Sequence, residues 1–262
     1  MIILTDIDDT LMRTARKVSG DPAQLKVGAI GKNGNPISFI DKKREKLIEQ
    51  FIDQAISIPV SARSKTGLKS LNINFNHHAV LNFGATIVDK NGEVDVNWHA
   101  LMVEESLFAK QKDAFEFVSS KLLSRLLDNR EYADLKYSPT EKLFEIKTMV
   151  EDGIHAYMNF RDFAPSREKR KILKETISTL LNQCEFSEYY IYETDRDLAI
   201  IPNFISKRIG SKWLLDKHYS SDDVIVGLGD HANDLSFMSL CDFIMFPTDS
   251  MLNLCLEKGV YV

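Results

Sequence analysis

Three short apolar runs that end in acidic or hydroxyl side chains constrain this chain more than any other feature. They cover residues 1–5, 56–60 and 224–228, and polar residues are almost absent within them. A strand of this kind must be covered on both faces, which is typical of the middle of a parallel sheet. Helical patterns alternate with these runs, so the sequence predicts an α/β fold.

Further elements are predicted around these three strands. Residues 26–40 read as a hairpin, because Asn33-Gly34 is a strong tight-turn signal between two apolar segments. Asp41 is placed to cap a helix that runs to about residue 54. The pattern also predicts strands over 78–83 and 242–246, a small hairpin that begins at 85–88, and helices over 207–219 and 234–240.

Between about residues 100 and 200 the pattern changes to helix, strand, strand, helix, strand, strand. The expected ranges are 104–127, 143–149, 155–160, 166–182, 188–193 and 197–201. We therefore expect a Rossmann-like parallel-sheet core made of residues 1–87 and 202–262. An inserted α+β cap domain, residues 88–201, would interrupt it.

Composition excludes several other classes of protein. The 33 basic and 38 acidic residues give a net charge of −5, so the bulk positive field that nucleic-acid binding needs is absent. A hydrophobic share of 44% argues against disorder, and no apolar run approaches the roughly 20 residues of a membrane span. Three cysteines without a CxxC pair favour neither a zinc site nor a disulfide framework. We expect a cytoplasmic protein with no nucleic-acid or membrane partner.

Polar side chains follow each of the three central strands. Asp6, Asp8 and Thr10 come after the first, Ser61 after the second, and Asp230, Asn233 and Asp234 after the third. In an open parallel sheet, ligands bind beyond the carboxyl ends of the strands, so these groups can converge on one crevice.

Such a set of groups suits phosphoryl transfer through an aspartyl-phosphate, in which a carboxylate is the nucleophile. Several carboxylates would repel a phosphate dianion, and Mg²⁺ (magnesium) removes this obstacle because it binds a few carboxylates together with substrate phosphate. Lys207, at the start of a predicted helix, would hold the phosphate, and Ser61 would donate a hydrogen bond to it. Asp8 would be the general acid and then the general base.

Four segments, in their order along the chain, resemble the motifs of haloacid-dehalogenase-type (HAD) phosphohydrolases. They are Asp6-Ile7-Asp8-Asp9-Thr10-Leu11, Ser61 after a strand, Lys207 before a helix, and Gly229-Asp230 with Asn233-Asp234. The insertion, and Asn82-Phe83-Gly84-Ala85, resemble the branch that contains trehalose-phosphate, sucrose-phosphate and mannosylphosphoglycerate phosphatases.

The resemblance implies a role for each matching residue. Asp6 would be the nucleophile and Asp8 the acid/base, while Ser61 and Lys207 would bind phosphate. Asn233 would orient a neighbouring group beside that phosphate. The metal Mg²⁺ would be held by Asp6, the backbone carbonyl of Asp8 and Asp230, with Asp234 in support.

Some positions depart from the pattern of the family. Ser61-Ala62-Arg63 stands where sugar phosphatases often have Thr-Gly-Arg, and Arg63 is either a substrate contact or a partner in a surface ion pair. Arg208 follows Lys207 where Gly is common, which leaves Lys212 as a rival phosphate lysine. The hairpin at 26–40 is an extra flap in this interpretation.

These observations predict a Mg²⁺-dependent phosphatase that acts on a small phosphorylated metabolite, with a sugar phosphate as the expected substrate. A phosphomutase or phosphotransferase would use the same aspartyl-phosphate and pass its group to a second sugar. A non-catalytic module that binds Mg²⁺ and phosphate is the third alternative.

Overall fold

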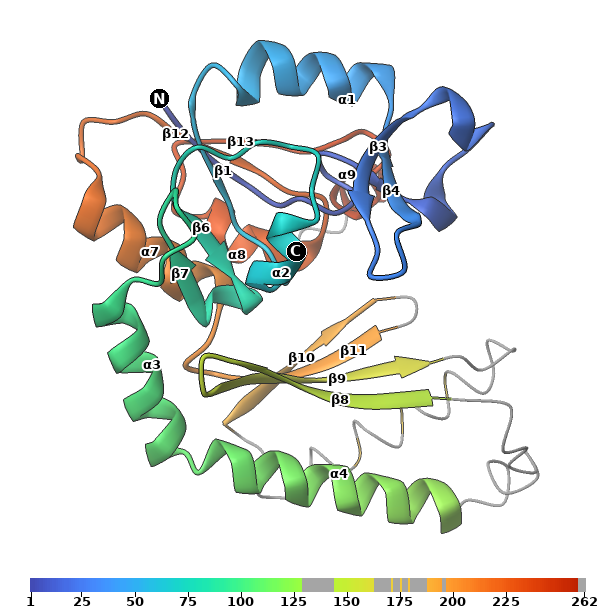
Figure 1. The fold of residues 1–262 in the computed structure, drawn as a ribbon, viewed down its shortest axis with the longest axis vertical. Coiled ribbons are helices and arrows are strands. Elements are labelled where there is room, and N and C mark those ends of the chain that lie inside the picture. Colours follow the sequence, from blue (N-terminus) through green and yellow to red (C-terminus); the bar gives the residue numbers. More distant parts are fainter. Residues whose placement is uncertain are drawn as a thin grey trace. The chain divides into compact units, whose positions relative to one another are not determined.

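The computed structural model describes residues 1–128, 144–162, 188–194 and 197–258, and the single positions 171, 175 and 179. This chain divides into two compact units (Figure 1). The first comprises residues 1–99 and 205–262, and the second comprises residues 100–204. The domain boundaries expected from the sequence remain a prediction: a core of 1–87 and 202–262, and a cap of 88–201.

A four-stranded parallel sheet with the order β13-β12-β1-β5 forms the centre of the first unit (Figure 1). Its strands are β1 (Ile2–Thr5), β5 (Ile56–Pro59), β12 (Ile225–Leu228) and β13 (Phe243–Met245). Every side chain of β1 is buried, as expected for a strand with neighbours on both sides. Thr5 lies between Leu228 and Pro59, so the carboxyl ends of three strands meet.

A short antiparallel hairpin extends this sheet beyond β5. It consists of β6 (Ala79–Leu81) and β7 (Thr86–Val88), joined by the 3₁₀ turn η4 (Asn82–Gly84). Val60 forms a parallel bridge to Val80, which connects β6 to the strand that precedes Ser61. The strand predicted over 78–83 is therefore shorter than expected, because Asn82 and Phe83 adopt positive φ angles of 50° and 59°.

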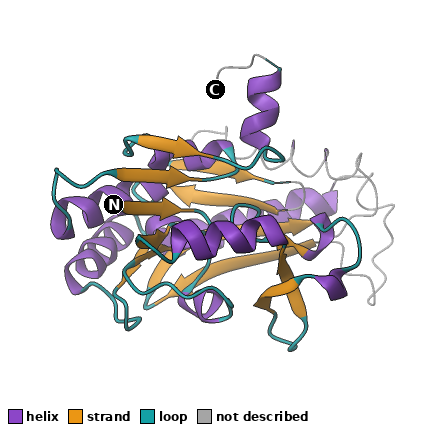
Figure 2. Cartoon of the chain, turned by 90° about the horizontal axis from the view of Figure 1, so that it is seen from above, coloured by secondary structure: helices purple, strands orange, loops and turns teal. Residues whose placement is uncertain are grey.

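Helices lie on both faces of the parallel sheet of the first unit (Figure 1). On one face, α1 (Lys42–Leu47) continues as the π-helical turn η3 (Ile48–Ile52), and Ile48 and Ile52 pack on Ile3 and Val226 of the sheet. The remaining helices are α2 (Lys65–Lys69), α7 (Lys207–His218), η5 (Ala232–Asp234), α8 (Leu235–Met238) and α9 (Met251–Glu257). Figure 2 shows α9 projecting away from the strands.

A three-stranded antiparallel sheet follows the first strand of the chain. It contains β2 (Arg13–Thr14), β3 (Lys26–Ile30) and β4 (Pro36–Ile40), with β4 in the middle. Two 3₁₀ turns, η1 (Ala15–Lys17) and η2 (Pro22–Gln24), lie between β2 and β3. The predicted hairpin is confirmed, and Gly34 adopts a φ of 80° in its turn, which suits a residue without Cβ.

The second unit contains an antiparallel sheet of order β10-β11-β9-β8. Its strands are β8 (Phe144–Glu151), β9 (Ile154–Asp162), β10 (Tyr189–Glu193) and β11 (Asp197–Pro202). The single helix predicted over 104–127 is two helices, α3 (Val96–Phe108) and α4 (Gln111–Asp128), because Lys110 adopts a φ of 45°. Asp95 caps α3 by accepting from the backbone N–H groups of Asn97 and Trp98.

The predicted fold class is confirmed: a Rossmann-like parallel-sheet core is combined with an inserted α+β unit. The helix predicted over 166–182 lies outside the described residues, apart from three isolated positions. Among the helices that the structure describes, none has the length and apolar character needed to cross a bilayer.

Candidate active site

The carboxyl end of the parallel sheet collects polar side chains from three strands. Asp6 follows β1 directly, and its N–H donates to the Leu228 carbonyl at 2.8 Å. On the other side, the Val60 N–H donates to the Thr5 carbonyl at 2.8 Å, which keeps the next residue, Ser61, one strand away from Asp6. Register therefore brings these side chains to one edge of the sheet.

Three carboxylates form a cluster at this edge. Asp6, Asp230 and Asp234 each present an oxygen, and these oxygens all lie within 4.8 Å of one another. Asp6 and Asp234 are only 7% and 2% exposed, so the cluster is largely shielded from water. Hard oxygen ligands in this arrangement suit a divalent cation such as Mg²⁺, which takes one or two carboxylates and completes its shell with water and phosphate oxygens.

Lys207 places a buried positive charge beside the same carboxylates. Its ammonium donates to Asp6 Oδ1 at 2.6 Å and to Asp234 Oδ1 at 2.7 Å, and the residue is 7% exposed. Lys212, the rival lysine, instead pairs with Asp216 one turn along the exposed face of α7. The structure thus brings Lys207, and not Lys212, to the carboxylate cluster.

The start of α7 is fixed by two close contacts. Ser206 caps the helix, since its hydroxyl accepts from the Ile209 N–H at 3.0 Å. Gly84 lies against the same turn, and a Cβ added to it would meet the Ser206 carbonyl oxygen at 2.1 Å. Only glycine allows η4 to approach so closely, and this contact sets the position from which Lys207 reaches Asp6.

Burial and mutual repulsion alter the acidity of the cluster. Desolvation is the largest influence on Asp6 and raises its pKa well above the usual value, against the opposing charge of Lys207. Desolvation, with the nearby charge of Asp234, also raises the pKa of Asp230 to about 7. Crowded acidic groups with raised pKa values are frequent at functional sites, and a bound cation would favour their ionised forms.

Asp234 also determines the shape of the loop after β12. Its Oδ2 accepts from the backbone N–H groups of Asp230 at 3.1 Å and His231 at 3.0 Å, while its Oδ1 faces Lys207. The His231 ring accepts from the Asn233 N–H at 3.3 Å. His231 therefore shapes the loop. The contact described between Asn233 and the His231 ring is made by the backbone N–H of Asn233.

Asp8 is held by a bidentate ion pair with Arg63. Arg63 Nε and Nη2 donate to Asp8 Oδ2 and Oδ1, both at 2.7 Å. The Arg63 side chain is 14% exposed, and its Nη1 also donates to the Gly67 carbonyl at 3.3 Å. Of the two roles expected for Arg63, the structure therefore shows the ion pair. This ion pair is mostly buried and does not lie on the surface, where it was expected.

Ser61 is buried at the end of the neighbouring strand. It is 1% exposed, and its hydroxyl oxygen accepts from the Arg63 N–H at 3.2 Å. Its backbone is fixed on both sides, because its N–H donates to Val80 and its carbonyl accepts from Phe83. The helix cap that a serine at this position could have formed is supplied by Ser64, which accepts from the Gly67 N–H.

Two further residues lie next to the cluster, and of these the sequence singled out Thr10 but not Arg44. Thr10 Oγ1 donates to Asp230 Oδ1 at 3.4 Å, and Arg44 Nε donates to the Thr10 carbonyl at 3.0 Å. Thr10 lies within the first motif, so its position was a usable signal. Arg44 lies 34 residues further along, in a charged segment that resembles an ordinary helix surface, and nothing local distinguished it.

Known proteins resemble this chain in structure but not detectably in sequence. No protein-family model matches the sequence, and no curated protein matches it.

Among solved structures, the C-terminal domain of trehalose-6-phosphate phosphatase from C. albicans is 15% identical, with a TM-score of 0.53 over 91% of this chain and 72% of that one. The sucrose-phosphatase from Synechocystis sp., in complex with sucrose and phosphate, is 10% identical, with a TM-score of 0.54 over 100% and 88% of the two chains. A trehalose-6-phosphate phosphatase related protein is 13% identical, with a TM-score of 0.50 over 94% and 86%.

At these identities the likeness concerns the fold. The chain has the fold of these three proteins, which confirms the fold expected from the resemblance to trehalose-phosphate and sucrose-phosphate phosphatases.

Proposed function

We propose that this protein is a Mg²⁺-dependent phosphatase that hydrolyses a small phosphomonoester, a sugar phosphate, through an aspartyl-phosphate on Asp6. One observation carries the proposal: the buried Lys207 ammonium bridges Asp6 and Asp234 beside Asp230, at the carboxyl end of a parallel sheet. With Mg²⁺ on these carboxylates, the metal and the Lys207 ammonium would together supply the positive charge that a phosphate dianion needs.

In the first half of the reaction, an Asp6 carboxylate oxygen attacks phosphorus and the bond from phosphorus to the ester oxygen breaks. Asp8, protonated and released from its ion pair with Arg63, gives its proton to the departing oxygen, which leaves as the sugar hydroxyl. Lys207 lies within hydrogen-bond distance of Asp6 and holds the transferring group against it. Ser61 donates a hydrogen bond to a phosphate oxygen.

In the second half, water attacks the phosphorus of the aspartyl-phosphate while Asp8 takes a proton from that water, which releases phosphate and restores Asp6. Mg²⁺, held by Asp6, the Asp8 carbonyl and Asp230, would supply the charge that lets an anionic ester approach several carboxylates. Asp234 supports this set through its contacts with Lys207 and the Asp230 N–H. Asn233 orients a neighbouring group.

The substrate class rests on the neighbours in fold. Two of them are named as phosphatases of trehalose 6-phosphate and of sucrose phosphate, both phosphorylated sugars. We extend this class to the present chain as part of the proposal, together with the role of residues 88–201 as a cap that selects the leaving group.

The test is hydrolysis of 4-nitrophenyl phosphate and of a panel of sugar phosphates by the wild type and by Asp6→Asn, each with Mg²⁺ and with EDTA. Loss of the nucleophile lowers kcat by about a thousandfold or more. The matched control is Asp216→Asn, which removes a carboxylate that, among the described residues, pairs with Lys212 on the surface of α7. Turnover by Asp6→Asn at the wild-type rate would overturn the proposal. Free phosphate as the product, even with glucose added as an acceptor, separates hydrolysis from phosphotransfer.

A further inference from the structure

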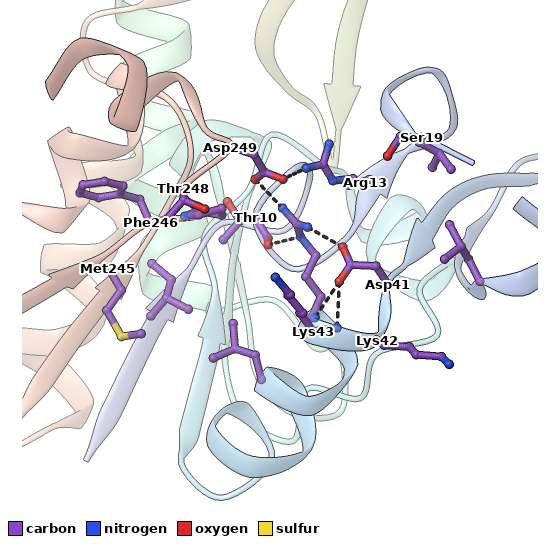
Figure 3. A pocket seen from close by; sticks show the side chains of 16 residues that line it. Thr10, Arg13, Ser19, Asp41, Lys42, Lys43, Met245, Phe246, Thr248 and Asp249 are labelled. Atoms are coloured by element: carbon purple, nitrogen blue, oxygen red, sulfur yellow. Dashed lines mark hydrogen bonds and ion pairs between the residues drawn. The ribbon is translucent and has the colours of Figure 1, made fainter. Parts of the chain in front are cut away.

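A cavity lies beside the carboxylate cluster, within the first unit, and the proposed reaction does not use it. Its volume is about 650 Å³, within the 300–1,000 Å³ that is usual for small-molecule sites. The segment after β2, the start of α1 and the loop after β13 enclose it (Figure 3). Asp6, Asp230, Asp234 and Lys207 are not among its lining residues.

The walls of this cavity are mostly apolar. Val18 and Leu25 come from the segment between β2 and β3, Leu47 comes from α1, and Met245 and Phe246 come from the end of β13 and the loop that follows. An apolar ligand body would gain free energy by covering these side chains.

A charged group of residues closes one end of the cavity. Arg13 forms an ion pair with Asp249, and the two side chains point toward each other in Figure 3. Arg44 Nη2 also contacts Asp249 Oδ1 at 3.1 Å, and Arg44 Nη1 contacts Asp41 Oδ2 at 2.6 Å. Asp249 is therefore the carboxylate that two guanidinium groups share.

The lining of the cavity as a whole favours an anion. Four lining side chains are cationic (Arg13, Lys42, Lys43 and Arg44) and two are anionic (Asp41 and Asp249), so positive charge is in excess by two. The Asp249 side chain is 44% exposed, while Arg44 is 10% exposed and fixed by the Thr10 carbonyl. Asp249 can consequently turn into solvent while both guanidinium groups stay in place to receive a carboxylate or a phosphate.

We propose that this cavity binds a small organic anion whose apolar body lies between Leu47 and Met245 and whose charged group replaces Asp249 at Arg13 and Arg44. The site is separate from the carboxylate cluster and is joined to it through Thr10, whose carbonyl accepts from Arg44 and whose hydroxyl donates to Asp230.

The test is isothermal titration calorimetry of the full chain with four probes: 1-naphthoate, 1-naphthylphosphonate, the neutral 1-naphthylmethanol and inorganic phosphate. The titrations contain EDTA, because without Mg²⁺ the carboxylate cluster repels phosphate and phosphonate. We then expect one saturable site for the two naphthyl anions, and the tighter of the two identifies the preferred acid. The neutral probe and inorganic phosphate each bind at least about tenfold more weakly, because the first lacks the charged group and the second lacks the apolar body.

Two variants have opposite expected effects. Arg13→Gln weakens binding of the preferred naphthyl anion about tenfold, while Asp249→Asn tightens it because the competing carboxylate is gone. A variant that only damaged the fold would not reproduce both directions. Lys212→Gln, a charge change on α7 away from the cavity, leaves the affinity unchanged.

Asp6→Asn separates this proposal from the proposed phosphatase activity, because it leaves the affinity for the naphthyl anion unchanged whether or not turnover is lost. Absence of saturable binding, equal affinities in Arg13→Gln and Asp249→Asn, or loss of binding in Asp6→Asn would each overturn the proposed site.

Discussion

At the scale of single residues, buried charges are compensated by specific partners. Asp6 and Asp234 both pair with Lys207, and Asp8 pairs with Arg63. Among the hydrogen bonds described for the Asp230 side chain there is only a long one, from Thr10. Removing one member of such a buried pair usually costs about 3–5 kcal/mol, because it leaves the other charge without compensation. Variants at these positions therefore need a readout that separates chemistry from stability.

The first prediction concerns Arg63. Arg63→Lys keeps the positive charge but cannot donate from two nitrogens in the plane of the Asp8 carboxylate, so Asp8 loses its fixed orientation. We expect kcat for 4-nitrophenyl phosphate to fall roughly ten- to a hundredfold, while KM changes little. Arg208→Lys is the control, since that guanidinium contacts Ser236 and Ser239 near the surface. A rise in KM with kcat preserved would instead identify Arg63 as a substrate contact.

The second prediction concerns the pKa of Asp230, which is raised from 3.8 to about 7 by burial. At pH 6 this carboxyl is mostly protonated, and a metal ligand must be ionised, so Mg²⁺ binding releases about one proton from it. At pH 8 this carboxyl is already ionised, and we expect tighter Mg²⁺ binding and less proton release. Calorimetry in buffers of different ionisation enthalpy measures both quantities. Equal proton release at pH 6 and pH 8 would contradict the assignment.

The same shift has a consequence for stability without metal. A carboxyl with a raised pKa in the folded state stays protonated between about pH 4 and pH 7, where the unfolded chain has already lost the proton. Its contribution to folding stability is therefore present at low pH and declines as the pH rises through 7.

At the scale of elements, the packing of η4 against α7 decides where Lys207 stands. Gly84 has a φ of 110° and lies against the backbone of Ser206, while Gly210, on the first turn of α7, faces the Gly84 backbone in return. Two glycines thus let a turn and a helix approach more closely than side chains would allow. This packing of η4 on α7 does not depend on the positive charge of the Lys207 ammonium.

The third prediction compares Gly84→Ala with Gly92→Ala. Both glycines have positive φ, so each substitution introduces backbone strain of about 1–2 kcal/mol. Only at Gly84 would the new Cβ also meet backbone, which adds roughly 1–3 kcal/mol and displaces the start of α7. Urea unfolding and kcat measure the two effects. Equal losses of stability and unchanged turnover in both variants would show that this contact does not position Lys207.

At the scale of the whole molecule, all three clustered carboxylates belong to the first unit. A ligand that binds only the folded state adds about 2.7 kcal/mol of stability at a hundredfold excess over its Kd. Mg²⁺ should therefore stabilise the first unit directly.

The fourth prediction follows from this location. Hydrogen exchange measured with and without Mg²⁺ should show added protection in β1, β12 and the loop after β12, and little change in the antiparallel sheet of β8 to β11. Asp230→Asn, which lacks one of the proposed ligands, should lose this protection. Protection of equal size in both units would place the metal elsewhere.

The sequence by itself determined the architecture and the chemical character of the site. Fully apolar strands must be covered on both faces, and turn and cap residues act locally, so the parallel sheet, the hairpin at 26–40 and the cap at Asp41 were readable from neighbouring residues alone. The acidic residues after β1 and β12 were identifiable for the same reason, because strand direction sends them to a common edge.

Only the tertiary structure decided which charges meet. Lys207 and Lys212 are both lysines on one helix, and the close approach permitted by Gly84 turns the first inward while the second reaches Asp216. Arg63 was predicted as either a substrate contact or a partner in a surface ion pair, and Arg44 looked like part of a helix surface. Each forms contacts to the loop after β1, across 55 and 34 residues of sequence. Contacts of this range depend on packing geometry and not on local pattern, and for that reason both the partner of Asp8 and the cavity beside Arg13 became visible only in the folded chain.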